Sequence, residues 1–402
     1  MGCLNINSLS KHIDELQIYM KDGLFDVLAI NETKLDDYDP DSIINLSGYT
    51  CIRKDRNKAG GGVCIYIRNT INFTRKTSFE DKDLEMISIE ITKANSSPFL
   101  FTTWYRPPKS SDELFDKFEN FLKKVDSKYK EHYILGDLNC DLIASNIHSH
   151  TSKLIDLFDI YQLCQLINEP TRVTENTKTL IDHIITNNKE YLTHHGVLTT
   201  SISDHNLIFA IRKIDHHRGP PRYIETRSFK NFNEAKFIQD IQNTNWPMPK
   251  DSDEVNHIWE DWKTKLRTVL DRHAPCRVKR VRNATSPWVN QHLKKEMYAR
   301  DILKKKATKS NLLADWLLFK EKRNAVNQLV KKTKKSYYQE EIKNNSGNPK
   351  GTWKALNSLM GKKTKSSEIP KIKLNLSEPI TDAKDIANSF NTHFTEIGPK
   401  LA

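Results

Sequence analysis

Short apolar runs alternate with longer segments of helical periodicity through the first half of the chain. Apolar, β-branched and aromatic residues predict strands at 26–32, 62–68, 84–91, 99–105, 132–137 and 207–212. Between them, apolar residues recur at the three- and four-residue spacing of amphipathic helices over 8–21, 112–126 and 151–163. Strands and helices mixed in this order predict an α/β or α+β domain of roughly 210 residues.

The pattern changes near residue 214. A polar, proline-containing segment follows, and we predict a linker over 215–252. Beyond it strand patterns largely disappear, and apolar stripes of helical period cover 253–273 and 311–340. We therefore predict one mixed domain over 1–214 and a mostly helical region over 253–402, with Lys and Arg on the solvent side of its helices.

Charge divides the chain at the same place. Residues 1–218 contain 26 Lys and Arg against 31 Asp and Glu, a net charge of −5, whereas residues 219–402 contain 37 against 20, a net charge of +17. A basic region joined to an acidic one indicates polyanion binding beside a domain whose carboxylates have another role.

Basic clusters alternate with aromatic residues in this second half. Lys304–Lys306 and Lys331–Lys335 are the densest clusters, and the aromatic residues around them are Trp288, Tyr298, Tyr337, Tyr338 and Trp353. Each basic run alone suits a solvated helix face. Together with the aromatic residues they favour contact with nucleic acid.

Cysteine spacing and hydropathy restrict the class of protein. The six cysteines are scattered without a C-x-x-C pair, which argues against a disulfide framework or a structural zinc site. We expect a reducing compartment, nuclear or cytoplasmic. No apolar run of about 18 residues occurs, so we predict no membrane partner, and no secretory signal opens the chain.

Polar side chains recur where the predicted strands end. The stretch YILGDLNCD runs apolar residues up to Gly136 and then presents Asp137 and Asn139. The same placement recurs at Asn5 and Asn7 (on one face of a short first strand), Glu32, Tyr105, Asp182 beside His183, and Asp204 beside His205. Residues at one edge of a sheet can converge in a single cleft, so this repetition predicts a shared site.

Each position also has a purely structural explanation. Gly, Asp and Asn form turns after strands, Glu32 could cap a turn, and Tyr105 could be half-buried packing. Asp182 fits such an explanation least, because an acid inside an apolar strand must be paired or lie in a polar cavity. Six coincidences of this kind in one chain favour the shared site.

The ordered motifs LNINSL, INETKL, TWYRPP, ILGDLN, LIDHI and SDHNLI resemble those of the endonuclease/exonuclease/phosphatase superfamily. More narrowly, they are similar to the apurinic-endonuclease-like domain of non-LTR (LINE) retrotransposons. The resemblance covers about residues 3–213 and implies a four-layer sandwich of two β-sheets flanked by helices. It also implies metal-dependent hydrolysis of phosphate esters.

The resemblance and the side-chain chemistry together suggest a role for each residue. We predict Mg²⁺ or Mn²⁺ as the cofactor, because such ions prefer carboxylate and carbonyl oxygens. The metal ligands would be Glu32, Asn5 and Asp204. The catalytic residues would be Asp137 as general base, Asn139 fixing the attacking water, His205 on a phosphate oxygen and held charged by Asp182, and Tyr105 as a donor to the phosphate. The substrate contacts would be Asn7, Thr171 and Arg172.

The second half carries a resemblance of its own. The stretches 287–306, 316–338, 351–361 and 386–398 are similar to the helical connector between endonuclease and reverse transcriptase in such elements. This favours a Mg²⁺-dependent endonuclease that nicks DNA to leave a 3′-hydroxyl, as in target-primed retrotransposition, with RNA as a second partner of the basic helices. Two alternatives stay open: a phosphatase or phosphodiesterase of the same superfamily, and an inactive remnant with a shortened first strand whose basic helices bind nucleic acid.

Overall fold

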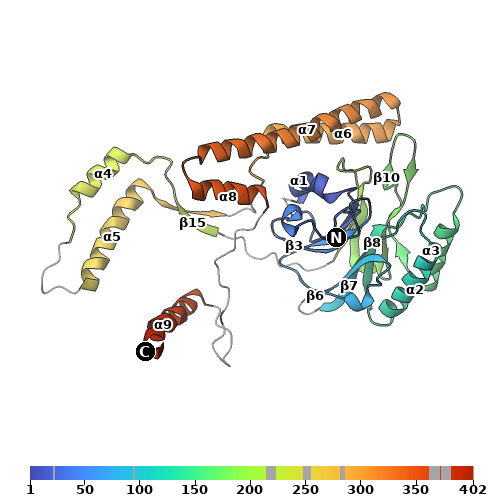
Figure 1. The fold of residues 1–402 in the computed structure, drawn as a ribbon, viewed down its shortest axis with the longest axis horizontal. Coiled ribbons are helices and arrows are strands. Elements are labelled where there is room, and N and C mark those ends of the chain that lie inside the picture. The colour runs from blue at the N-terminus through green and yellow to red at the C-terminus, as the bar shows by residue number, and fades with distance from the viewer. Residues whose placement is uncertain are drawn as a thin grey trace. The chain divides into compact units, whose positions relative to one another are not determined.

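The computed structural model describes residues 1–20, 23–93, 96–213, 223–247, 255–280, 286–361, 372 and 382–401. They form two compact units, Met1–Glu340 and Glu341–Ala402. The first unit contains both large β-sheets and their covering helices (Figure 1). None of the helices within these ranges combines the length and apolar character needed to cross a membrane.

The first sheet has the strand order β13-β14-β1-β2-β4-β3. Its strands are β1 (Gly2–Asn5), β2 (Val27–Asn31), β3 (Tyr49–Lys54), β4 (Val63–Arg68), β13 (Leu192–Leu198) and β14 (Leu207–Arg212). β1 runs parallel to β2, with Asn5 opposite Asn31. Because both strands end at this pair, Asn5 and the following Glu32 lie at the same edge of the sheet.

The second sheet has the strand order β5-β6-β7-β8-β12-β9. Its strands are β5 (Asn72–Arg75), β6 (Glu85–Lys93), β7 (Ser96–Tyr105), β8 (His132–Asp137), β9 (Cys164–Gln165) and β12 (Asp182–Thr186). β7 runs parallel to β8, while β12 runs antiparallel to β8 and places Asp182 opposite Asp137. Two acidic residues distant in sequence are therefore cross-strand neighbours.

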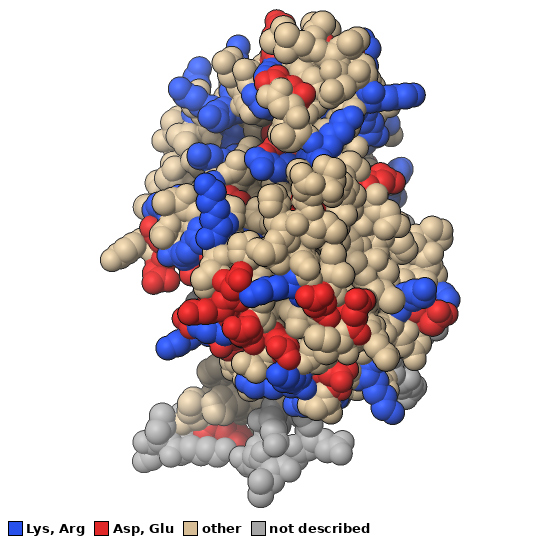
Figure 2. Space-filling model, turned by 90° about the vertical axis from the view of Figure 1, so that its right-hand side faces the viewer, with Lys and Arg blue, Asp and Glu red and all other residues tan. Residues whose placement is uncertain are grey.

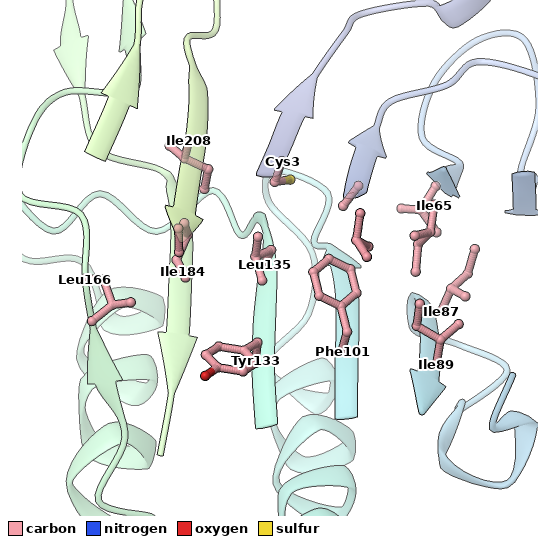
Figure 3. Packing of buried hydrophobic residues seen from close by; sticks show 14 of the residues in the cluster. Cys3, Ile65, Ile87, Ile89, Phe101, Tyr133, Leu135, Leu166, Ile184 and Ile208 are labelled. Carbon is pink, nitrogen blue, oxygen red and sulfur yellow. The ribbon is translucent and has the colours of Figure 1, made fainter. Parts of the chain in front are cut away.

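The two sheets pack face to face through an apolar core. Cys3 and Ile208 of the first sheet and Phe101, Leu135 and Ile184 of the second are buried in this layer (Figure 3). α1 (Leu9–Met20) packs on the other face of the first sheet. α2 (Glu113–Asp126) and α3 (Ser149–Ile160) pack on the other face of the second sheet. The predicted four-layer sandwich is confirmed.

Shorter elements complete the sandwich. These are β10 (Arg172–Val173) paired with β11 (Lys178–Thr179), and the 3₁₀ turns η1 (Asp41–Ile44), η2 (Thr77–Phe79) and η3 (Lys189–Tyr191). Each of the six predicted strands corresponds to an observed one. The sequence pattern missed β3, β5, β9–β11 and β13, whose alternation is weak or whose length is only a few residues.

Part of the predicted linker is structured. Residues 223–247 contain β15 (Tyr223–Arg227) and α4 (Glu234–Asn243), and β15 pairs with β16 (Cys276–Arg280) beyond α5 (Val255–His273). The predicted boundary at 214, the remainder of the linker and the first two residues of the predicted helical region lie outside the described residues.

The predicted helical C-terminal region is confirmed. In the first unit, α6 (Gln291–Ser310) ends at Asn311, which adopts a left-handed conformation with φ 55°, and α7 (Leu313–Asn344) follows. Trp288, Leu293 and Met297 pack against Val326 and Val330 to join the two helices, which we call the α6–α7 hairpin. The second unit contains α8 (Pro349–Leu359) and α9 (Ala383–Leu401).

The expectation that Lys and Arg lie on the solvent side of these helices is wrong at two positions. Arg300 is fully buried and Lys304 is 2% exposed. Both side chains face the sandwich, where carboxylates and backbone carbonyls accept their hydrogen bonds. The other lysines and arginines of α6 and α7 are exposed or partly exposed. Figure 2 shows Lys and Arg gathered over the upper part of one face.

Candidate active site

The ends of β1, β2, β7 and β8 bring four polar side chains together at one edge of the sandwich. Asn5 Nδ2 donates to Asp137 Oδ2 at 2.8 Å and to Glu32 Oε1 at 3.0 Å. The Tyr105 hydroxyl donates to the same Glu32 oxygen at 3.2 Å. Asn5 is therefore the link between the two sheets at this edge, and both carboxylates lie within its reach.

The local backbone shapes this edge. Gly136 lies so close to β7 that a Cβ at this position would be 1.7 Å from the Trp104 carbonyl oxygen, which explains the glycine directly before Asp137. Glu32 and Asn139 both have positive φ, at 52° and 50°. Non-glycine residues seldom adopt this conformation, and such strain is concentrated at functional sites.

Asn139 turns back beneath Asp137. Its backbone N–H donates to Asp137 Oδ1 at 3.0 Å, and its Nδ2 donates to the Arg106 carbonyl oxygen at 2.8 Å. Asp137 thus accepts one hydrogen bond on each carboxylate oxygen, from Asn139 and from Asn5. These bonds fix the direction of the carboxyl group in a buried position.

His205 lies between two buried acids. Its Nδ1 is 2.8 Å from Asp182 Oδ2 and 3.9 Å from Asp137 Oδ2. Burial opposes a charge on the imidazole, but Asp182 first and Asp137 second outweigh it and raise the pKa of His205 to about 9. The imidazole is therefore protonated at neutral pH.

The pKa of Asp137 is raised as well, but in an acid this shift favours the neutral form. Burial and the charge of Asp182 raise its pKa to about 7, against the opposing effects of His205 and of the hydrogen bond from Asn5. A carboxyl group with a pKa close to the working pH can accept a proton from water and release it again. Burial and Glu32 likewise raise the pKa of Tyr105, which keeps its hydroxyl a donor.

Thr171, Arg172 and Asp204 form the side of the site nearest β10. Thr171 Oγ1 accepts from the backbone N–H of Asp182 at 3.0 Å and so orients the strand rather than facing outward. Arg172 Nε donates to Asp204 Oδ2 at 2.8 Å. Burial raises the pKa of Asp204, but His205 and then Arg172 outweigh this effect and lower it. Asp204 is therefore ionised and pairs with Arg172.

Asn7 departs from its expected position. We expected Asn5 and Asn7 on one face of the first strand, but β1 ends at Asn5 and Asn7 has a positive φ of 50°. Its backbone N–H donates to Asn5 Oδ1 at 3.1 Å, while its own Oδ1 accepts from Lys34. The Asn7 side chain is exposed at the rim of the site.

Sequence reasoning missed two residues that hold the site in place. Asn31 is fully buried, and its Oδ1 accepts from the Asp137 backbone N–H at 2.9 Å. Ser203 Oγ donates to the Asn5 carbonyl oxygen at 2.6 Å and accepts from the His205 N–H at 3.1 Å. Asn31 could have been found by the argument used for Asp182, since a polar residue inside an apolar strand needs partners. Ser203 carries no comparable signal.

Two sets of residues could hold a divalent ion. Among the described residues, ligand atoms of Asp137, Asp182 and His205 lie within 4.8 Å of one another. In this set His205 Nδ1 already lies 2.8 Å from Asp182 Oδ2, so the imidazole is engaged by a carboxylate. Glu32 with Asn5 suits a metal better: the Glu32 side chain is 21% exposed and offers hard oxygen ligands beside an excess of negative charge.

The sequence of residues 2–205, about half of the chain, matches the Endonuclease/Exonuclease/phosphatase family. The chain belongs to this family. The matched range contains every site residue described above, from Asn5 to His205. No curated protein matches the chain.

Several solved structures are similar to this member of the Endonuclease/Exonuclease/phosphatase family. The endonuclease domain of TRAS1, a telomere-specific non-LTR retrotransposon, is 12% identical, with a TM-score of 0.43 over 54% of this chain and 98% of that one. The 3′-5′ exonuclease NExo from Neisseria meningitidis is 19% identical, with a TM-score of 0.43 over 52% and 98%. An AP endonuclease from Archaeoglobus fulgidus is 16% identical, with a TM-score of 0.40 over 53% and 98%.

Proposed function

We propose that this chain is a divalent-metal-dependent endonuclease that nicks DNA and leaves a 3′-hydroxyl. The observation that carries the proposal is the convergence of Glu32, Asp137 and His205 from three distant chain segments. Asn5 links Glu32 to Asp137, and His205 lies between Asp137 and Asp182. Family membership supports hydrolysis of a phosphate ester. The buried acids and the charged imidazole support the division of roles below.

Asp137 is the general base of the proposed reaction. Its carboxyl group is held by Asn5 and by the Asn139 backbone, and its raised pKa suits removal of a proton from the attacking water near neutral pH. The strained turn at Asn139 keeps the base at a fixed angle to the strand end. We assign Asn139 the task of orienting that water.

His205 holds the phosphate. Because Asp182 occupies Nδ1, the protonated ring presents Nε2–H to a nonbridging oxygen, where it offsets the negative charge that develops during attack. Tyr105 donates to the same phosphate once substrate displaces its contact with Glu32. Both groups are donors over the whole neutral pH range.

The divalent ion would be held by Glu32 and Asn5, with Asp204 nearby. Mg²⁺ or Mn²⁺ in such a site polarises phosphate oxygens and stabilises the leaving oxygen. The Asn5 amide donates to Glu32 and to Asp137, and so would hold the Glu32 carboxylate in place for a cation. The residues present therefore fit the ion chemically.

Nucleic acid is the substrate that the charge distribution favours. The net charge of +17 over residues 219–402 attracts a polyphosphate backbone, whereas a small phosphate monoester would gain little from it. Arg172 and Asn7 are exposed at the rim of the site and are the proposed substrate contacts. Thr171, also expected to touch substrate, is buried and would act only by orienting the strand of Asp182. The similarity of the C-terminal helices to a retrotransposon connector extends the proposal to target-primed retrotransposition, with RNA as a second ligand, in the nucleus or cytoplasm.

Plasmid nicking tests the proposal. Supercoiled plasmid incubated with the full chain and Mg²⁺ should become open circle, EDTA should prevent this, and the nick should be extendable by a DNA polymerase because it ends in a 3′-hydroxyl. Asp137→Ala should abolish nicking. Supercoiled plasmid left intact while a phosphoinositide is hydrolysed would replace the endonuclease with a phosphatase, and no hydrolysis of either substrate would favour an inactive remnant.

A further inference from the structure

The α6–α7 hairpin packs on the sandwich beside the candidate active site, and buried charges hold it there. Arg300 Nη1 donates to Glu15 Oε2 of α1 at 2.7 Å, and its Nε and Nη2 contact Asp301 Oδ1 at 3.1 and 3.0 Å. The Tyr19 hydroxyl of α1 donates to Asp301 Oδ2 at 2.7 Å. α1 directly follows the segment that contains Asn5, so the hairpin is anchored next to the site.

An apolar contact holds the other end of the hairpin. Ala307 of α6 and Trp316 and Phe319 of α7 form a buried cluster with Val173 of β10. Val173 is the neighbour of Arg172, the ion-pair partner of Asp204. The hairpin thus contacts a second segment that carries candidate site residues.

Lys304 reaches a third such segment. Its side chain is 2% exposed, and Nζ donates to the carbonyl oxygens of Thr200 and of Ser203, the latter at 2.9 Å. The two residues after Ser203 are Asp204 and His205. The ammonium group therefore holds the backbone of the loop 200–205 directly before the catalytic imidazole.

Burial of an ammonium group is costly unless hydrogen bonds compensate for its lost hydration. Burial lowers the pKa of Lys304 to about 8, with Asp204 partly opposing this effect. Without Lys304, the buried carbonyl oxygen of Thr200 and the partly buried one of Ser203 would lose this donor. Nothing in a helix that only binds nucleic acid requires such an arrangement.

The other side of the same loop is attached to β1. Ser203 Oγ donates to the Asn5 carbonyl oxygen at 2.6 Å and accepts from the His205 N–H at 3.1 Å. The loop is consequently held between Lys304 and Asn5. A displacement of its backbone would move His205 relative to Asp182, whose contact at 2.8 Å leaves little tolerance.

A pocket of about 450 Å³ lies between the hairpin and the sandwich. Asn7 and Asp204 of the sandwich and Arg323 and Asn327 of α7 line it. Lys304 lines the same pocket, beside the loop that it holds.

We propose that Lys304 is a positioning residue of the candidate active site, so that the α6–α7 hairpin contributes to hydrolysis. By binding the carbonyls of Thr200 and Ser203, it fixes the loop that presents His205 to the phosphate. The inference rests on the proposed function for its catalytic consequence, but its structural consequence can be measured without any activity.

Steady-state nicking by the full chain tests the catalytic consequence. For Lys304→Met we expect kcat to fall about tenfold or more, with the KM for DNA changed by less than about twofold, because orientation is lost while binding is kept. Lys294→Met is the matched control, since Lys294 is an exposed lysine of α6 outside the basic clusters named above, and should behave as wild type. A raised KM with unchanged kcat would make Lys304 a DNA contact, and unchanged kcat and KM would leave it a purely structural residue; either result overturns the proposal.

Hydrogen–deuterium exchange tests the structural consequence even if wild type nicks nothing. Amides of a peptide covering 200–206 should exchange faster in Lys304→Met than in wild type or Lys294→Met. Lys304→Gln keeps one amide donor and serves if the methionine variant does not fold; the same local increase is expected in it. If amides 200–206 of the folded variant exchange as slowly as in wild type, the positioning role is refuted, whether or not the chain is an endonuclease.

Discussion

Two clusters of buried charged side chains lie in the first unit, and they differ in how their charges are balanced. Beneath the α6–α7 hairpin, Arg300 pairs with Glu15 and Asp301, and Lys304 donates to backbone carbonyl oxygens, so carboxylates and cations are equal in number. At the sheet edge, Asp137 and Asp182 flank His205, and Glu32 lies beside Asn5, with Lys34 3.3 Å from Glu32 at the rim. Negative charge is in excess there.

The difference shows which cluster is structural and which awaits a ligand. Balanced buried charges hold two surfaces in register and need nothing further. Burial and then the negative charge of Asp182 raise the pKa of Asp137 to about 7. The unbalanced carboxylates would also repel a phosphodiester. A divalent cation would relieve both kinds of repulsion at the sheet edge.

The largest expected effect is on activity and is confined to the unbalanced cluster. Asp137→Asn and His205→Gln should each lower the nicking rate by about 10²–10⁴-fold, because a general base and a phosphate donor contribute on this scale. Asp156→Asn changes an exposed acid on α3 and should leave the rate unchanged. Near-wild-type nicking by either site variant would remove that residue from the mechanism.

The largest expected effect on stability is in the balanced cluster. Arg300→Met leaves Glu15 buried without its partner and should lower the free energy of unfolding by about 3–5 kcal/mol in a denaturant titration. Lys322→Met breaks only the surface pair with Glu296 and should have no measurable effect. If both substitutions were equally mild, the hairpin would not depend on its buried charges.

A smaller effect depends on pH. The pKa of Asp137 is about 7 in the folded protein against an ordinary 3.8, so between these values the folded state binds the extra proton and stability falls as pH rises. In EDTA, Asp137→Asn should therefore gain stability relative to wild type as pH rises from about 4 to about 7. Thermal unfolding of both proteins across this pH range measures the difference in stability. A difference that stays constant with pH would contradict the raised pKa of Asp137.

The sandwich could be predicted from the sequence because its strands follow simple rules. β2 and β8 are buried along their whole length, and β4 is buried except at its last residue, Arg68. Each strand reads as a short apolar run bounded by polar residues. The polar residues at their ends were recognisable for the same reason, since they interrupt an apolar pattern. Strands of two residues, such as β9 and β10, leave no periodic signal.

The docking of the hairpin could not be predicted from the sequence. Arg300 and Lys304 lie in a basic stretch that reads as a solvated helix face, and only their partners Glu15 and Ser203, distant in the chain, distinguish them from exposed neighbours. The change of direction at Asn7 was also hidden, because alternation of Leu4, Asn5 and Ile6 continues the strand pattern past the point where β1 ends.

Metal titration tests the central claim most directly. Mn²⁺ added to the apoprotein at neutral pH, followed by electron paramagnetic resonance, should show one site that Mg²⁺ displaces. Glu32→Gln should weaken this site at least about tenfold, whereas Glu15→Gln, in the balanced cluster, should leave it unchanged. Equal Mn²⁺ affinity in wild type and Glu32→Gln would contradict the account, because the excess of carboxylates at the sheet edge would then hold no cation.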